Sequence, residues 1–293
     1  LYAAEVTPTI AHSFNDVDRA MRWGYGWDLG PFELLEAIGV DQFIEACQIE
    51  KTAPLVQNLE ISRKPSTPDL QILRLAKTRR PVIKQNAGAS LIDLDDGVLA
   101  VEFHSKMNTL GGDAVEMLQL GVREAEENFH ALVVGNDAAA FSAGANLTLV
   151  LLEAQEQNWN EIELMVRAFQ AAVTGLLHAR VPVVVAPAGF TLGGGCEIAL
   201  HADSVQAAAE TYMGQVEVGV GLIPAGGGTK ELLARSMAQL VAVSSDPMPL
   251  VHDAFELIAL AKVSTSAKDA KRLGFLREID SVTMNRERLL SDA

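Results

Sequence analysis

The chain has 293 residues, of which 49% are hydrophobic and 21% are charged. That composition excludes a disordered or fibrous protein and suffices for one large globular domain or two unequal ones. The net charge of -15 argues against a nucleic-acid groove or an anionic-membrane surface, so an anionic ligand would have to be bound by a few local groups. Two cysteines, Cys47 and Cys196, are too few for a disulfide framework and fit a reducing cytoplasm.

No stretch of the chain is apolar over the roughly 18 to 20 residues that a membrane-spanning helix needs. The longest candidate, residues 181–192, is interrupted by Pro182, Pro187 and Gly189. We therefore expect no membrane contact and a cytoplasmic location. The chain starts at Leu1 instead of a methionine, without a basic or apolar leader, so we also expect a fragment of a longer protein.

Residues 1–58 are expected to form a small helical domain. Residues 22–32 contain two tryptophans and too many glycines for a continuous helix, so they predict an aromatic turn. Pro31 is suited to the first turn of a helix, which Gly39 would end before another helix begins near Asp41.

Residues 59–87 are expected to be a linker that contains a short helix. The composition changes there to proline, serine and threonine at 64–69, followed by a basic patch at 77–81. We expect the second domain to span residues 88–293.

The second domain begins with a strand pattern. Residues 89–94 and 98–103 are apolar runs on either side of an Asp-Gly turn, which predicts a β-hairpin. Residues 112–128 carry apolar side chains at helical spacing with acidic side chains between them, and residues 131–134 have the composition of a buried strand.

The same order of elements then recurs. Helices are expected at 147–153 and 159–179, a buried strand at 181–186, and a glycine-bearing turn at 191–196 that opens a helix at Glu197. The recurring strand, strand, helix unit predicts an α/β fold with a stacked or wound sheet.

Two glycine-containing turns, at 141–146 and 191–196, each follow an apolar strand and open a helix. One intervening helix and a returning strand would bring these turns side by side. Because helix N-termini present free backbone N–H groups and the positive end of the helix dipole, the pair would form a two-donor site for an oxygen that acquires negative charge. The N–H groups of Ala145 and Gly194 are the expected donors.

Two acidic residues are candidates for acid–base chemistry at this site. Glu197 directly follows the glycine run, and Glu217 lies between Val216 and Val218, which is not an ordinary solvated position. If both carboxyl groups face the donors, burial and mutual repulsion should raise at least one pKa and leave one acid and one base near neutral pH. Such a pair suits reactions that add or remove a proton next to a carbonyl.

Each of these features also has a structural explanation. A glycine triplet is most often a tight strand-to-helix junction, and an acid in a first helical turn usually complements the helix dipole. Neither 193–195 nor 226–230 has the spacing of a nucleotide-binding loop. His201 lacks a second histidine at metal-ligand spacing and Cys196 lacks a histidine partner, so both are expected to be packing residues. The catalytic interpretation rests on the features occurring together.

Three segments in combination resemble the enoyl-CoA hydratase (crotonase) family: Phe-Ser-Ala-Gly-Ala-Asn at 141–146, the run at 189–197, and residues 215–229. Residues 106–110 and 266–276 fit the same pattern, so the resemblance covers about residues 88 to 290. It implies a crotonase-type spiral of strand-strand-helix repeats that assembles as a homo-trimer or hexamer.

The resemblance also implies roles for individual residues. The N–H groups of Ala145 and Gly194 would hold the thioester carbonyl oxygen of an acyl-CoA. Glu197 would activate the water that attacks the β-carbon, and Glu217 would protonate the α-carbon. The residues that would bind the coenzyme A part of the substrate are Lys106, Met107, Ala143, Asn146, Leu147 and Gly193. We expect neither a metal nor a separate cofactor, because coenzyme A belongs to the substrate.

The N-terminal segments at 16–26 and 29–35 resemble part of the C-terminal helical domain of 3-hydroxyacyl-CoA dehydrogenases. This implies a bifunctional parent of fatty-acid β-oxidation with the dehydrogenase upstream. The sequence contains no βαβ unit for NAD, so NAD would bind only to the missing N-terminal domain and no dehydrogenase activity is expected here.

Because both acids are present, the resemblance implies hydration of trans-2-enoyl-CoA to 3-hydroxyacyl-CoA. Two alternatives stay open. One is a 3,2-enoyl-CoA isomerase, which moves a proton and needs no water. The other is a non-catalytic scaffold that binds acyl-CoA or a partner enzyme.

Overall fold

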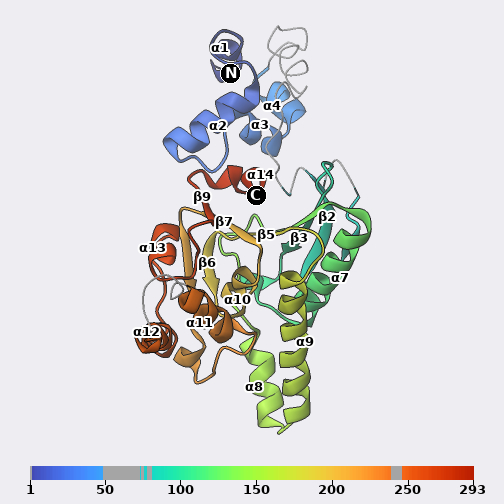
Figure 1. Cartoon of the computed structure of the whole chain (residues 1–293). Coiled ribbons are helices and arrows are strands. Elements are labelled where there is room, and N and C mark those ends of the chain that lie inside the picture. The colour runs from blue at the N-terminus through green and yellow to red at the C-terminus, as the bar shows by residue number, and fades with distance from the viewer. Residues whose placement is uncertain (1, 49–72, 74–75, 78–80, 239–245) are drawn as a thin grey trace. The chain divides into compact units, whose positions relative to one another are not determined.

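The computed structural model describes residues 2–48, 73, 76–77, 81–238 and 246–293 (Figure 1). The chain divides into two compact units, Leu1–Asp69 and Leu70–Ala293, and each is considered by itself. No helix in the described ranges combines the length and the apolar character needed to span a membrane.

The described part of the first unit, residues 2–48, contains four short helices: α1 (Tyr2–Ile10), α2 (Phe14–Tyr25), α3 (Pro31–Ile38) and α4 (Val40–Ala46). The helices expected after Pro31 and near Asp41 are confirmed. The turn expected over 22–32 is shorter than predicted, because α2 continues through Gly24 to Tyr25 and ends at Gly26, whose φ of 68° is in the left-handed region. A single glycine in the last turn of a helix is tolerated.

A stacked pair of phenylalanines joins α2 to α3. The rings of Phe14 and Phe32 are parallel to within 6°, with centroids 3.9 Å apart. Asp18 is also buried, and its Oδ1 accepts a hydrogen bond of 2.8 Å from the backbone N–H of Phe32 in the first turn of α3. Burial raises the pKa of Asp18 to about 6, although this hydrogen bond acts in the opposite direction.

The second unit is built on a seven-stranded sheet in the order β1-β2-β3-β4-β5-β7-β9. The first two pairs are antiparallel and the others parallel. Strands β6 and β8 form a separate parallel pair. The strands are β1 (Lys84–Gln85), β2 (Ala89–Asp93), β3 (Val98–Phe103), β4 (Ala131–Gly135), β5 (Val183–Ala186), β6 (Gly189–Leu192), β7 (Ser204–Ala208), β8 (Thr211–Gly214) and β9 (Ser281–Thr283).

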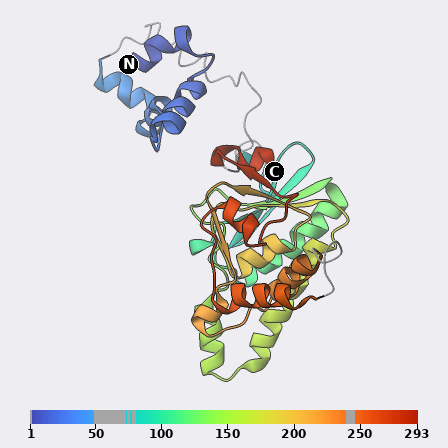
Figure 2. The ribbon, with the colours of Figure 1, turned by 60° about the vertical axis from the view of Figure 1, so that its left-hand side comes forward.

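Helices cover this sheet and connect its parallel strands. They are α7 (Gly112–Asn128), α8 (Leu147–Gln155), α9 (Trp159–Leu177), α10 (Gly194–Leu200), α11 (Gly228–Ala238), α12 (Met248–Ala259), α13 (Ala267–Arg272) and α14 (Leu289–Asp292), with 3-10 turns at Lys106–Asn108, Glu217–Val220 and Arg286–Arg288. Figures 1 and 2 show α8 and the first turns of α9 extending from the sheet as a helical hairpin.

The strands and long helices expected in this unit are confirmed, including the hairpin of β2 and β3, and the fold is α/β with strand-strand-helix repeats. One predicted start is wrong. Helix α10 begins at Gly194, three residues before the expected Glu197, so two glycines of the triplet lie inside its first turn. This start matters for the site, because it makes Gly194 the first residue of a helix.

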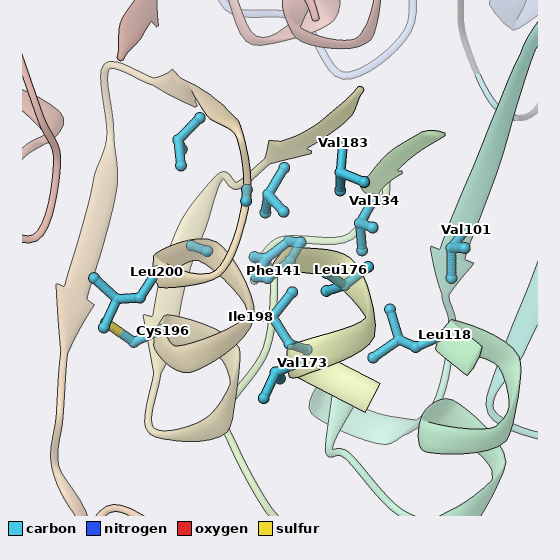
Figure 3. Close-up of a cluster of buried hydrophobic side chains, with 14 of the residues drawn as sticks. Val101, Leu118, Val134, Phe141, Val173, Leu176, Val183, Cys196, Ile198 and Leu200 are labelled. Carbon is cyan, nitrogen blue, oxygen red and sulfur yellow. The ribbon is translucent and has the colours of Figure 1, made fainter. Parts of the chain in front are cut away.

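The core lies between the sheet and the inner faces of α7, α9 and α10. Figure 3 shows Phe141 next to Ile198 of α10 and Leu176 of α9, all fully buried. Since Ile198 follows Glu197 directly, packing of α10 against this core fixes the position of the carboxylate-bearing turn.

The expected linker needs correction at its C-terminal end. Strand β1 pairs with β2, and the buried side chains of Leu73 and Ala76 pack in a cluster with Ile92 of β2. Lys77 forms an ion pair with Glu102 of β3. These residues belong to the second unit because their apolar and charged partners are on the sheet. Residues 59–72, 74–75 and 78–80 of the expected linker lie outside the described residues.

Candidate active site

The two glycine-containing turns lie side by side, as the sequence predicts. Ser142 and Thr191 form a parallel bridge, in which the N–H of Ser142 donates to the carbonyl oxygen of Phe190 at 3.0 Å and the N–H of Leu192 donates to that of Ser142 at 3.0 Å. At Gly144, whose φ is 91°, a Cβ would lie 3.1 Å from the Leu192 carbonyl oxygen and 3.5 Å from the Gly194 nitrogen. Glycine therefore permits both the backbone conformation and the close approach of the two turns.

Two backbone N–H groups at this contact are available to a ligand. Gly194 is the first residue of α10, so its N–H has no acceptor within the helix. The N–H of Ala145 likewise has no acceptor among the residues that the structure describes. Both residues border the same cavity, and their action as a pair of donors to one oxygen stays a prediction.

Glu197 is held at the N-terminus of a second helix. Its side chain is 2% exposed, and its Oε1 accepts a hydrogen bond of 2.9 Å from the N–H of Gly228, the first residue of α11. Burial raises the pKa of Glu197, whereas backbone N–H groups of the 226–228 turn lower it. The glycine triplet at 226–228, which does not match a phosphate loop, thus supplies donors to a carboxylate of the protein itself.

Glu217 lies on the other side of the 193–194 turn. A Cβ at Gly193 would be 3.3 Å from its Oε1, and its Oε2 is buried without a hydrogen-bond partner in the described structure. Burial raises the pKa of Glu217 to about 7, and the nearby charge of Glu197 contributes in the same direction. At neutral pH a substantial fraction of Glu217 is therefore protonated.

These groups border a cavity of about 730 Å³ whose walls are mainly apolar. Ala145, Gly194, Glu197 and Glu217 all line it. Among the expected coenzyme A ligands, the cavity is also lined by Ala143, Asn146, Leu147 and Gly193. Lys106 and Met107 are exposed and lie outside the cavity lining.

Helices α7 and α9 contribute cavity residues that sequence reasoning missed. Phe169 of α9 is half-buried between two glycines: a Cβ at Gly194 would lie 3.1 Å from its ring, and a Cβ at Gly226 would lie 2.3 Å from it. Val115 and Met165 line the apolar wall. These positions belong to ordinary amphipathic helix patterns, so their place in a cavity could not be distinguished from core packing.

His201 and Cys196, for which the sequence predicts packing roles, are both buried at α10. The ring Nδ1 of His201 lies 2.7 Å from the carbonyl oxygen of Glu197, and burial lowers the pKa of this histidine. Cys196 is fully buried, and burial raises the pKa of its thiol. Within the described ranges, no group of three or more His, Cys, Asp or Glu side chains could hold a metal ion.

Residues 93–288 match the family model of enoyl-CoA hydratase/isomerase, which accounts for more than half of the chain. The chain belongs to this family. Its fold agrees with two solved enoyl-CoA hydratases, from Polaromonas sp. JS666 and Bacillus anthracis. The first has a TM-score of 0.56 at 23% identity and covers 72% of this chain and 74% of that one. The second has a TM-score of 0.55 at 24% identity and covers 70% of this chain and 72% of that one.

The chain is also similar to parts of longer proteins. A Bacillus subtilis protein named as a probable 3-hydroxyacyl-CoA dehydrogenase is 40% identical over 318 residues, which cover 100% of this chain and 40% of that protein. A Rickettsia felis protein named as a fatty acid oxidation complex trifunctional enzyme is 29% identical over 301 residues, with the same coverage. The chain thus spans about 40% of the length of these relatives.

Proposed function

We propose that this member of the hydratase/isomerase family hydrates trans-2-enoyl-CoA to 3-hydroxyacyl-CoA in fatty-acid β-oxidation. One observation carries the proposal: four residues border one apolar cavity. They are the buried Glu197, the half-buried Glu217, and Ala145 and Gly194, whose backbone N–H groups are the candidate donors. Addition of water across an activated double bond needs a base for water, an acid for carbon and a site for the developing oxyanion.

In this mechanism the thioester carbonyl oxygen accepts hydrogen bonds from the N–H groups of Ala145 and Gly194. Glu197 removes a proton from water as its oxygen bonds to the β-carbon, and negative charge accumulates on the thioester oxygen. Glu217 then delivers its proton to the α-carbon. One proton enters the protein at Glu197 and one leaves at Glu217, so return of the Glu197 proton to solvent and reprotonation of Glu217 complete the cycle.

The electrostatic differences between the two glutamates support this division of roles. Burial raises the pKa of Glu197, and the N-terminus of α11 with the Gly228 N–H acts in the opposite direction, which stabilises the carboxylate form that a base requires. Glu217 has no such donor on Oε2 in the described structure, and its pKa of about 7 keeps much of it protonated near neutrality, as an acid requires.

The cavity also supports an acyl-CoA substrate. Its apolar walls suit an acyl chain, while Ala143, Asn146, Leu147 and Gly193 line the same cavity and would border the coenzyme A end of the substrate. Exposed Lys106, with Met107, would meet the coenzyme outside the cavity. We further propose a cytoplasmic homo-oligomer that needs no separate cofactor, as part of a parent chain whose NAD-binding domain lies upstream.

The test is turnover of a trans-2-enoyl-CoA, followed by the loss of the conjugated thioester absorbance. Glu197→Gln and Glu217→Gln should each lower kcat by about 100- to 10,000-fold, because each amide replaces a proton-transfer group. Glu256→Gln is the matched control, since the side chain of Glu256 on α12 is 43% exposed, pairs with Lys262 at 2.8 Å and does not border the cavity. Unchanged turnover in either active-site variant would contradict the proposed roles.

Two parallel assays separate the alternatives. Conversion of a cis-3-enoyl-CoA to the trans-2 isomer without hydration of that product would identify an isomerase. Tight binding of an acyl-CoA with no turnover of either substrate would identify a scaffold.

A further inference from the structure

Two consecutive residues before the cavity adopt a left-handed backbone conformation. Met107 has φ of 57° and Asn108 has φ of 49°. Asparagine tolerates this region better than most residues, but a methionine in it is unusual, and the conformation persists only where surrounding contacts determine it. Asn108 is 2% exposed and therefore held inside the protein.

Three hydrogen bonds join this turn to the 140–143 segment. The carbonyl oxygen of Met107 accepts from the N–H of Ala143 at 3.2 Å. The carbonyl oxygen of Asn108 accepts from the hydroxyl of Ser142 at 2.7 Å, and the side-chain amide of Asn108 donates to the carbonyl oxygen of Ala140 at 2.8 Å. The carbonyl groups of both left-handed residues thus accept hydrogen bonds from the loop that leads to Ala145.

Ser142 transmits this constraint further along the loop. Its hydroxyl, on a fully buried side chain, donates to Asn108 and accepts from the N–H of Gly144 at 3.1 Å. Gly144 would otherwise be the most permissive point of the loop, because glycine has access to both signs of φ. The hydroxyl therefore restrains the backbone that immediately precedes Ala145.

These bonds leave one donor of the loop for a ligand. From Ser142 to Asn146, four N–H groups have acceptors: those of residues 142, 143, 144 and 146 bond to Phe190, Met107, Ser142 and Leu110. The remaining N–H, that of Ala145, has no acceptor in the described part of the chain. The loop is thus tied on both sides of the donor at the cavity.

We propose that Ser142 and Asn108 are positioning residues that hold the Ala145 N–H in the geometry needed to bind the thioester oxyanion. The inference rests on the proposed hydratase function and assigns the two side chains a role in carbonyl polarisation. In Ser142→Ala, the Gly144 N–H and the Asn108 carbonyl would both lose their hydroxyl partner, so the 143–144 peptide would lose its restraint and only the bond of 2.8 Å from the Leu110 N–H to the Gly144 carbonyl oxygen would still hold the 144–145 peptide. The donor would then be displaced while the acids stayed in place.

The experiment compares the wild-type chain with Ser142→Ala and with Ser90→Ala as the control. Ser90 is a matched residue because it is also a buried serine, 1% exposed, whose hydroxyl lies 2.8 Å from the ring nitrogen of His104, and it does not border the cavity. The probes are kcat and KM for a trans-2-enoyl-CoA and the absorbance maximum of bound 2,4-hexadienoyl-CoA, which shifts to longer wavelength when its carbonyl is polarised.

Ser142→Ala should lower kcat by about 10- to 100-fold, less than the full loss of an oxyanion donor, with KM changed less than about threefold. It should also reduce the red shift of the bound dienoyl-CoA, whereas Ser90→Ala should leave both unchanged. Asn108→Gly provides a second variant that retains the left-handed backbone and the carbonyl acceptor but loses the bond to Ala140. It should show the same changes to a smaller extent.

A red shift and kcat equal to wild type in Ser142→Ala would overturn the inference, even if its thermal stability fell. If Ser142→Ala does not fold, a wild-type red shift in Asn108→Gly overturns it. Failure of the proposed function is distinguishable, because the wild type itself would then not hydrate the trans-2-enoyl-CoA, whether or not it shifts the absorbance of the dienoyl-CoA.

Discussion

The Glu197 and Glu217 pair determines how activity should depend on pH. Hydration needs ionised Glu197 and protonated Glu217, and the pKa of Glu217 is about 7. Since an acid is protonated below its pKa, kcat/KM, which reports the groups of the free enzyme, should fall about tenfold per unit as pH rises well above 7, and should fall at acidic pH as Glu197 becomes protonated. Measurement of kcat/KM from about pH 5 to 9 checks this. A flat profile across that range would contradict the assignment of the acid.

Asp18 makes a separate prediction for the first unit. Its folded-state pKa of about 6 exceeds the ordinary value of 3.8, so the folded state retains a proton that the unfolded chain has already lost between these values. The stability of this unit should be greatest below about pH 4 and decrease as pH rises to about 6. Asp18→Asn, which keeps an oxygen acceptor for the Phe32 N–H, should remove most of that decrease.

Tryptophan fluorescence can isolate this effect. Trp23 and Trp27 belong to the first unit and Trp159 to the second, so a Trp159→Phe background reports on the first unit. Urea unfolding at about pH 4 and about pH 7 would then be compared between this background and the same protein carrying Asp18→Asn. Equal pH dependence in both proteins would exclude Asp18 as the source.

At the scale of elements, the glycine turn at the start of α11 should be intolerant of side chains. A Cβ at Gly226 would lie 2.3 Å from the Phe169 ring and 2.5 Å from a carboxylate oxygen of Glu197. Gly226→Ala should therefore displace the base and lower kcat at least about tenfold, as expected for a misplaced catalytic group. The measurement is kcat for a trans-2-enoyl-CoA.

Gly175→Ala is the matched control for this substitution. Gly175 lies within α9, and a Cβ there would meet no atom within 4 Å. Gly175→Ala should leave kcat unchanged and raise the free energy of unfolding by roughly 0.5 to 1 kcal/mol, because alanine is a better helix former than glycine. Equal kcat in the two variants would show that the turn is not tightly coupled to Glu197.

Local patterns explain which elements could be predicted from sequence. The hairpin of β2 and β3, the long helix α7 and the strand β4 carry their own hydrophobic periodicity, so they are recognisable without a fold. Strand β1 has two exposed residues and exists because β2 offers it an edge. The start of α10 at Gly194 depends in the same way on the neighbouring 142–144 turn, which no local pattern contains.

The same difference between local pattern and tertiary contact separates the site residues that the sequence predicts from those that it does not. Ala145, Gly194, Glu197 and Glu217 were identifiable because glycine turns and apolar-flanked acids are unusual in sequence. Phe169 and Asn108 were not recognised as parts of the site, because their significance arises from contacts between segments distant in the chain, such as the 2.8 Å bond from Asn108 to Ala140. Tertiary contacts select among residue types that are individually common.

At the scale of the whole molecule, the net charge of -15 should oppose the binding of an anionic coenzyme A ester. Local groups such as Lys106 and helix N-termini must offset a repulsive field, and salt screens the long-range field more strongly than short-range contacts. We therefore expect kcat/KM for an enoyl-CoA to rise as ionic strength increases from about 10 to 150 mM, over which the Debye length falls from about 30 to 8 Å.

The matched control is the enoyl-pantetheine thioester, which has the same reacting group but lacks the phosphates. Its kcat/KM should be nearly independent of salt, because it carries no charge for the field to act on. A decrease in kcat/KM for the enoyl-CoA with added salt would mean that local cations dominate the encounter. In that case Lys106→Ala should abolish the salt dependence, which would locate the phosphate contact beside the exposed side chain of Lys106.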